Sequence, residues 1–287
     1  MTSRLTILDR ISVASGAVND DRVGAAGPLA WAIDGATDVL AEPLLPGGSD
    51  AAWIAAVADA ELARLGAGFS GALDDLVLRL TETAARRFAA ERSRAPIDAH
   101  EQPSAAALIV RLAGLNVDYV SLADCQCLAR APGEATTALG HDPEVTQGDR
   151  RAIEVMQTFR ANAQSSTWRE ARAHLWPRIR AARGRLNTPD GYGVLSVIPP
   201  PEKFMRTGQT RVAPGTRLLL ATDGFMRLTD LFARYSWDEL FDLAARDGLS
   251  ALVDELRQME VADGDCLHVP RTKPHDDASA ILLEVMG

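Results

Sequence analysis

The sequence has few cysteines, no long apolar run and fewer basic than acidic residues. Three cysteines in 287 residues are an odd number in a chain long enough to form a large core, so we expect reduced thiols and a cytoplasmic location. No window holds about 18 uncharged apolar residues, which argues against a membrane span. The charged N-terminal segment lacks the pattern of a secretory signal. A net charge of −9 argues against nucleic acid as a partner.

The rest of the composition is typical of a globular protein, with 47% hydrophobic and 24% charged residues. Alternating or apolar runs predict strands, and longer amphipathic stretches predict helices. The strands appear in antiparallel runs with helices grouped between them, so we expect an α+β fold of layered antiparallel sheets. The expected strands cover about 5–13, 29–33, 105–112, 117–122, 192–198, 216–222 and 279–285, and the expected helices cover about 50–65, 72–92, 237–246 and 249–260.

One segment interrupts this pattern. Residues from about 143 to 185 are rich in Arg, Glu and Ala and are expected to form a helical insert or an exposed helical layer. No linker long enough to divide the chain is present, so we predict one domain over residues 1–287 that carries this insert. Its basic part, 169–185, could contact a partner, although a solvated helix face is the simpler interpretation.

Aspartates directly follow several of the expected strands. Asp-Gly occurs five times, and the pairs at 190, 247 and 263 fit a turn or a helix end. Asp34 and Asp223 instead follow apolar strands, which can hold a carboxylate rigidly enough for a metal site. The glycine after each lets a backbone carbonyl approach a ligand. Further acidic residues at expected strand ends are Asp20, Asp21, Asp124, Asp276 and Asp277.

Carboxylates that converge in a cleft of low dielectric repel one another, and protons or divalent cations relieve that repulsion. Ligation by oxygen alone selects hard cations such as Mg²⁺ or Mn²⁺. Two such ions about 4 Å apart can ionise a bridging water and stabilise an in-line displacement at phosphorus. If the aspartates meet in space, the sequence therefore favours metal-dependent chemistry on a phosphate group.

Taken in chain order, the strand-end residues form a set of short motifs. These are Asn19-Asp20-Asp21, Ile33-Asp34-Gly35-Ala36-Thr37, Ala123-Asp124, Ala221-Thr222-Asp223-Gly224 and Asp276-Asp277 before the last strand. The set resembles the PP2C family of metal-dependent Ser/Thr protein phosphatases, over residues from about 10 to 286. The resemblance implies a four-layer α-β-β-α sandwich of two antiparallel sheets flanked by helices. It also implies a bacterial enzyme that hydrolyses phosphoserine or phosphothreonine in a phosphoprotein, with a metal-bridging water as nucleophile and a Ser/Thr kinase as a linked partner.

The resemblance also implies a ligand set for two Mg²⁺ or Mn²⁺ ions and a third, weaker one. The residues that match by position are Asp20, Asp34, Gly35, Asp124, Asp223 and Asp276. Asp20 would act through water, and Asp124 would hold the third ion. Asp34 and Asp223 are the principal catalytic candidates. His275 adjoins a predicted ligand and could protonate a leaving alkoxide, although a polar loop histidine is an equally simple interpretation.

This sequence departs from the family pattern where the substrate would be handled. Gly16 stands in place of a phosphate-binding arginine, Ala36 in place of a histidine, and Cys125-Gln126 in place of Ser-Arg. The conceivable substitutes for the missing cation are Arg22, Lys203 and Arg206, each of which is more simply a surface charge. The second hypothesis is therefore a regulatory or binding module with weak or no phosphatase activity.

Two other patterns are weaker. Cys125 and Cys127 point to one face of a strand and could form a zinc site with Cys266 and His268, but the one-residue spacing is tight and buried cysteine is commonly a small hydrophobe. Gly148-Asp149-Arg150 imitates the motif around Asp124 but lies in the expected helical segment. Neither pattern enters the predicted site.

Overall fold

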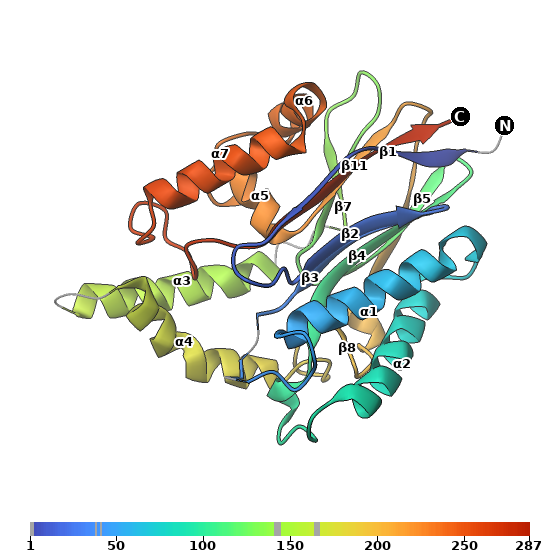
Figure 1. Ribbon diagram of the computed structural model, residues 1–287. Coiled ribbons are helices and arrows are strands. Elements are labelled where there is room, and N and C mark those ends of the chain that lie inside the picture. Colours follow the sequence, from blue (N-terminus) through green and yellow to red (C-terminus); the bar gives the residue numbers. More distant parts are fainter. Residues whose placement is uncertain (1–2, 38, 41, 141–144, 164–166) are drawn as a thin grey trace.

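The computed structural model describes residues 3–37, 39–40, 42–140, 145–163 and 167–287, and two antiparallel sheets lie at its centre (Figure 1). One sheet has the strand order β1-β11-β10-β6-β7, and the other has the order β2-β3-β4-β5-β9, with β8 paired to β4. The strands are β1 Arg4–Val13, β2 Asp21–Ala26, β3 Leu29–Gly35, β4 Ser104–Ala113, β5 Asn116–Leu122, β6 Gln126–Arg130, β7 Thr137–Leu139, β8 Leu195–Ser196, β9 Arg206–Arg211, β10 Arg217–Ala221 and β11 Ala278–Met286.

Helices cover the outer face of each sheet. The α-helices are α1 Asp50–Leu65, α2 Leu73–Glu91, α3 Val145–Asn162, α4 Trp168–Arg183, α5 Asp223–Asp230, α6 Trp237–Asp247 and α7 Leu249–Ala262, and the short 3-10 helices are η1 Gly66–Gly68, η2 Ala99–Glu101 and η3 Glu202–Phe204. None of the helices in the described ranges has the length and hydropathy of a membrane span.

Alternation along β3 shows how the layers are built. Trp31 and Ile33 pack outward with α1 and α2, whereas Ala30 and Ala32 pack inward against residues of the other sheet. Successive side chains of a strand point to opposite faces, so one strand contributes to two cores. A third core joins the outer face of the β10–β11 sheet to α5, α6 and α7. These layers confirm the predicted α-β-β-α sandwich.

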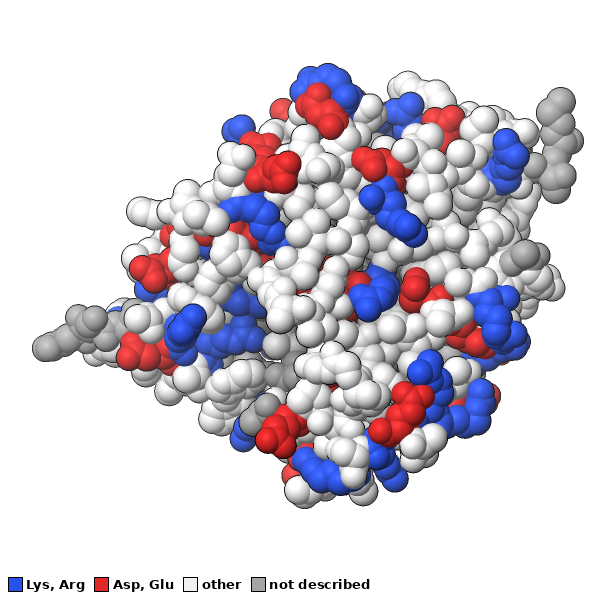
Figure 2. Space-filling view, in the orientation of Figure 1, with Lys and Arg blue, Asp and Glu red and all other residues white. Residues whose placement is uncertain are grey.

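The predicted helical segment corresponds to α3 and α4, which we call the helical arm and which extends from the sandwich in Figure 1. The arm has a small core of its own, formed by Met156, Ala171 and Leu175. Thr167 and Glu170 cap the start of α4 reciprocally. Figure 2 shows basic side chains over this part of the molecule, and the exposed arginines of the arm include Arg150, Arg151, Arg169, Arg178 and Arg180.

The expected strand at 192–198 is wrong, because only Leu195–Ser196 pairs in a sheet. The side chain of Asn187 provides the physical reason. Its amide donates to the carbonyls of Val194 and Ile198, at 3.0 and 2.7 Å, and its oxygen accepts from the N–H of Val194 at 2.9 Å. These bonds satisfy backbone groups that a longer strand would have paired, so the segment follows a loop instead.

Candidate metal centre

The two sheets bring the predicted ligands Asp34, Asp223 and Asp276 together. Asp34 lies near the end of β3, Asp223 is the first residue of α5 directly after β10, and Asp276 lies two residues before β11. The carboxyl groups of Asp34 and Asp223 share a hydrogen bond, and the charge of Asp276 acts on both. Three residues that are far apart in the sequence therefore meet at one end of the sandwich.

Asp21 is a fourth member of this cluster, and the sequence did not single it out as a ligand. It begins β2 directly opposite Asp34 in the β2–β3 register and is only 1% exposed. The hydroxyl of Thr222 donates to its carboxylate at 2.7 Å. Asp20, the predicted ligand beside it, accepts a hydrogen bond from the Ser49 hydroxyl at 2.6 Å. Of the two neighbouring acids, Asp21 is the one buried in the cluster.

Basic side chains surround Asp276. Arg227 of α5 donates to one carboxylate oxygen at 2.8 Å, and Lys273 forms an ion pair with the other. Arg227 also forms an ion pair at 2.6 Å with Glu260 of α7, whose side chain is fully buried. This chain of contacts fixes the orientation of Asp276.

Asp277 joins the N-terminal loop to the last strand. Its carboxylate accepts hydrogen bonds from the backbone N–H and the hydroxyl of Ser15, at 2.6 and 2.8 Å. Its other oxygen accepts from the N–H of Asp20 at 2.6 Å. Asp277 therefore positions the loop that carries Asp20.

Two glycines let the backbone segments of the cluster approach closely. A Cβ on Gly35 would lie 2.7 Å from the carbonyl oxygen of Asp20, to which the Gly35 N–H donates at 3.1 Å. A Cβ on Gly224 would lie 1.9 Å from the carbonyl oxygen of Asp277. Real Cβ atoms cannot come so near to a backbone oxygen, so the glycines after Asp34 and Asp223 are required by packing, besides any role of a carbonyl toward a ligand.

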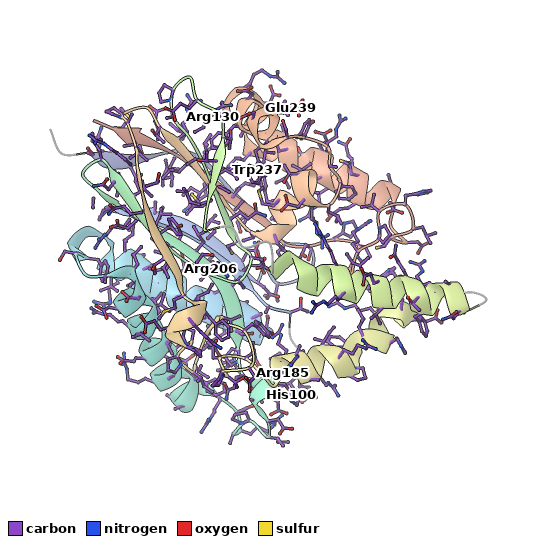
Figure 3. All side chains as sticks on the ribbon, turned by 180° about the vertical axis from the view of Figure 1, so that it is seen from behind. His100, Arg130, Arg185, Arg206, Trp237 and Glu239 are labelled. Carbon is purple, nitrogen blue, oxygen red and sulfur yellow. The ribbon has the colours of Figure 1, made fainter. Side chains whose placement is uncertain are left out.

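Asp124 lies in the turn between β5 and β6 and is half-buried. Its charge contributes to raising the pKa of Asp34, after burial and the three aspartates described above. Ala123 before it has a φ of 62°, the left-handed region that costs energy for a residue with a Cβ. Arg206, labelled in Figure 3, donates to the Ala123 carbonyl at 2.5 Å and so holds this turn.

The other proposed substitutes for the missing cation have different contacts. Arg22 donates to the carbonyls of Asn19 and Asp21, at 2.9 and 2.6 Å, and supports the start of β2. Lys203 is exposed and donates to the carbonyl of Pro189 at 2.5 Å. His275 has its Nδ1 3.1 Å from Glu260, on the Arg227 side of Asp276. A proton-donating role for His275 stays a prediction.

Burial and mutual repulsion perturb the acids of the cluster. Burial raises the pKa of Asp34, Asp21 and Asp223, and the neighbouring aspartates raise each further. Burial also tends to raise the pKa of Asp276, but Lys273 and Arg227 outweigh it and hold that pKa below its usual range. The cluster thus holds one stable carboxylate next to three that favour protons or added cations.

These shifts predict how the stability of the metal-free protein depends on pH. A group whose pKa is raised in the folded state contributes stability that is fully present below the unfolded pKa of 3.8. That stability is lost as the pH rises through the raised pKa. The pKa of Asp276 is shifted in the opposite direction, so the stability that its ionised form contributes is lost only below pH 3.8. In EDTA, the thermal midpoint should therefore fall as the pH is raised above 3.8. The decline should be smaller in Asp34→Asn and smaller with Mn²⁺, and an equal decline in all three samples would contradict this account.

Comparison with solved structures supports the fold. The chain matches the catalytic domain of the serine/threonine phosphatase PstP in complex with two manganese ions, at 15% identity and a TM-score of 0.57, with both chains covered completely. A second structure of that protein, from Mycobacterium tuberculosis, gives 16% identity and 0.59 over both full lengths. PppA of Pseudomonas aeruginosa gives 15% identity and 0.54, over 100% of this chain and 99% of the other. This chain has the PP2C phosphatase fold. No family model matches the sequence, and no curated protein matches it.

Two residues that depart from the PP2C family pattern, Gly16 and Ala36, can now be located in the fold. Gly16 is exposed, and a Cβ there would meet no atom within 4 Å. It follows Ser15, which binds Asp277, so the open position lies beside the acidic cluster. Ala36 lies directly after Gly35, and its N–H donates to the carbonyl of Ser104 at 3.0 Å. The space for larger side chains is therefore present at position 16, although this chain does not use it.

The donor chemistry of the cluster suits a divalent cation, because it consists of carboxylates and one glycine carbonyl. Yet no group of three His, Cys, Asp or Glu side chains stands ready to hold a metal ion among the described residues. The contacts explain why. Asp34 and Asp223 are hydrogen-bonded to each other, and Asp276 forms ion pairs with Lys273 and Arg227. A cation would have to replace protein contacts, of which that of Lys273 is the more accessible.

Proposed function

We propose that this protein is a metal-dependent phosphomonoester hydrolase that removes phosphate from serine or threonine side chains of proteins. The observation that carries this proposal is the meeting of Asp34 and Asp223, at the ends of strands from two different sheets, with Asp276 beside them. The PP2C fold is shared with structures described as serine/threonine phosphatases, which supports the same activity here.

In this proposal, Asp34, Asp223 and Asp276 hold two Mg²⁺ or Mn²⁺ ions with the Gly35 carbonyl. Asp20 or Asp21 contributes through water, and Asp124 serves a third ion. When bound, such ions neutralise negative charge on a phosphate and lower the pKa of a coordinated water. The manganese ions named for PstP agree with this choice of metal.

The chain's own residues would set the geometry of the reaction. Arg227 and Glu260 fix Asp276, and Thr222 fixes Asp21. Asp277 holds the N-terminal loop in place, so the cluster is supported from several elements at once. His275 is the proposed proton donor to the leaving alkoxide, which would require its ring to turn from Glu260 toward the substrate.

The setting of this activity is part of the proposal. We place the protein in a bacterial cytoplasm, since its three cysteines are free and buried. Its substrate would be a phosphoprotein, and a Ser/Thr kinase would supply the phosphate that it removes. The single-domain organisation with the helical arm as an insert also stays a proposal.

The alternative is a binding module with little turnover, and the ion pair of Lys273 with Asp276 favours it.

Purified protein should release phosphate from a phosphothreonine peptide, and the rate should increase with Mn²⁺ and vanish in EDTA. Calorimetric titration with Mn²⁺ in parallel separates the two hypotheses. Metal binding without phosphate release from several phosphopeptides would support the module and reject the enzyme.

A further inference from the structure

Lys273 differs from the other basic residue that contacts Asp276. The side chain of Arg227 is only 8% exposed and is held between Asp276 and the fully buried Glu260. Lys273 is 27% exposed and lies in the loop between α7 and β11. Arg227 is therefore a fixed structural cation, whereas Lys273 borders the solvent at the acidic cluster.

The surroundings of Lys273 place its ammonium between the two halves of the site. Besides Asp276, it donates to the hydroxyl of Thr37, two residues after Gly35, at 3.3 Å. The ammonium thus lies where segments following β3 and preceding β11 approach each other.

The helical arm supports the two segments that Lys273 joins. Arg183 of α4 donates to the Thr37 carbonyl and to the Ser104 hydroxyl, both at 3.0 Å. Arg172 of α4 donates to the carbonyl of Thr272, the residue before Lys273, at 3.2 Å. These hydrogen bonds to neutral oxygens of the protein position the two segments that Lys273 joins.

Lysine is rare in this chain, which makes its presence here informative. Of 30 Lys and Arg residues, only Lys203 and Lys273 are lysine. A lysine ammonium is a compact charge on a flexible four-carbon stem, whereas a guanidinium is a planar group that prefers a fixed pairing. A side chain that must exchange one anionic partner for another is better served by the lysine.

The charge of the cluster requires such an exchange. Seven aspartates lie at the site, namely Asp20, Asp21, Asp34, Asp124, Asp223, Asp276 and Asp277, and a phosphomonoester would bring further negative charge. A divalent cation that binds Asp276 competes with Lys273 for the same carboxylate. An ammonium released from Asp276 would then be available to a phosphate, whose oxygens are strong acceptors of a charged hydrogen bond.

Resting on the proposed function, we propose that Lys273 binds the phosphate group of the substrate and so takes the place of the cation absent at position 16. The site thereby couples two events, because the same metal that loads Asp276 frees the ammonium for the substrate. Lys273 would touch the phosphate oxygens directly and would not ligate the metal.

The test compares Lys273→Met with wild-type protein, both as the full chain saturated with Mg²⁺. Calorimetry should show that inorganic phosphate binds Lys273→Met about tenfold or more weakly, as expected for loss of a charged hydrogen bond. The KM for p-nitrophenyl phosphate should rise by a similar factor. Lys273→Arg should retain most of the phosphate affinity, and Lys203→Met, at the exposed second lysine, should match the wild type.

Titration with Mn²⁺ measures whether the same variant changes the affinity for the metal. Lys273→Met should bind Mn²⁺ at least as tightly as the wild type, because it has lost a competitor for Asp276. Unchanged phosphate affinity together with tighter Mn²⁺ binding would overturn the proposal and make Lys273 a counter-ion of the empty cluster only. If the wild type hydrolyses no phosphomonoester but phosphate binding still depends on Lys273, the proposed function fails and this assignment stands. Lys273→Gln provides the same comparison if the methionine variant does not fold.

Discussion

Asp34→Asn is expected to reduce Mn²⁺-dependent hydrolysis of p-nitrophenyl phosphate by about a thousandfold or more. Asp34 is the carboxylate that contacts Asp223 and lies opposite Asp21, so it is shared by both halves of the cluster. Catalytic metal ions contribute several kcal/mol to transition-state stabilisation, and about 4 kcal/mol corresponds to a thousandfold in rate. The change is nearly isosteric and also removes a repelled carboxylate, so the metal-free variant should be folded and at least as stable as the wild type.

The matched control is Asp190→Asn, which alters another Asp-Gly pair. Asp190 is exposed in the turn after α4. This variant should keep the wild-type rate and the wild-type affinity for Mn²⁺. Equal activity in the two variants, measured at saturating Mn²⁺ with both proteins folded by circular dichroism, would remove Asp34 from the catalytic centre and with it the proposed mechanism.

Arg227→Met should lower the free energy of unfolding by about 3–5 kcal/mol, the cost of breaking a buried ion pair by removing one partner. Within the described residues, the variant leaves the fully buried side chain of Glu260 to Arg257 and His275, and it leaves Asp276 to Lys273 and the backbone N–H of Asp277. Urea unfolding followed by circular dichroism measures the loss. Mn²⁺ affinity should fall as well, because Asp276 loses the contact that orients it.

Arg234→Met is the control for this second experiment. Arg234 lies in the loop between α5 and α6 and pairs with Glu255 of α7, but its side chain is 52% exposed. An exposed ion pair contributes at most about 1 kcal/mol, so this variant should unfold nearly as the wild type does. A loss below 1 kcal/mol for Arg227→Met would show that the network around Glu260 does not support the fold.

Part of the site could be predicted from local sequence because its main ligands follow apolar strands. Asp34 and Asp223 differ from the other Asp-Gly pairs by the strands before them, and these strands fix the direction of the carboxylates. Asp21 could not be identified as a member of the cluster in the same way. Its strand, β2, has the sequence DRVGAA, whose small residues have weak strand propensity, and pairing with β3 is what buries it.

The supporting cations were also beyond the reach of sequence patterns. Arg227 lies on α5, a helix of eight residues that no sequence pattern indicated, and its partner Glu260 comes 33 residues later. Lys273 lies in a loop that has no periodicity to interpret. The strands β6, β7 and β9 were missed because they are short or polar and depend on their neighbours for pairing. The fold class could still be predicted, because it depends on the longer apolar strands and the amphipathic helices.

The inter-sheet core has a consequence for redox chemistry. Cys125 and Cys127 are at most 1% exposed between the sheets, and burial raises the pKa of both thiols, that of Cys127 to about 12. For Cys125, the aspartates of the cluster raise it further. Peroxides and alkylating agents attack the thiolate, which is almost absent at either position at neutral pH. The acids proposed to hold the metals therefore also suppress ionisation of the Cys125 thiol, and peroxide should leave both of these thiols reduced in the folded protein.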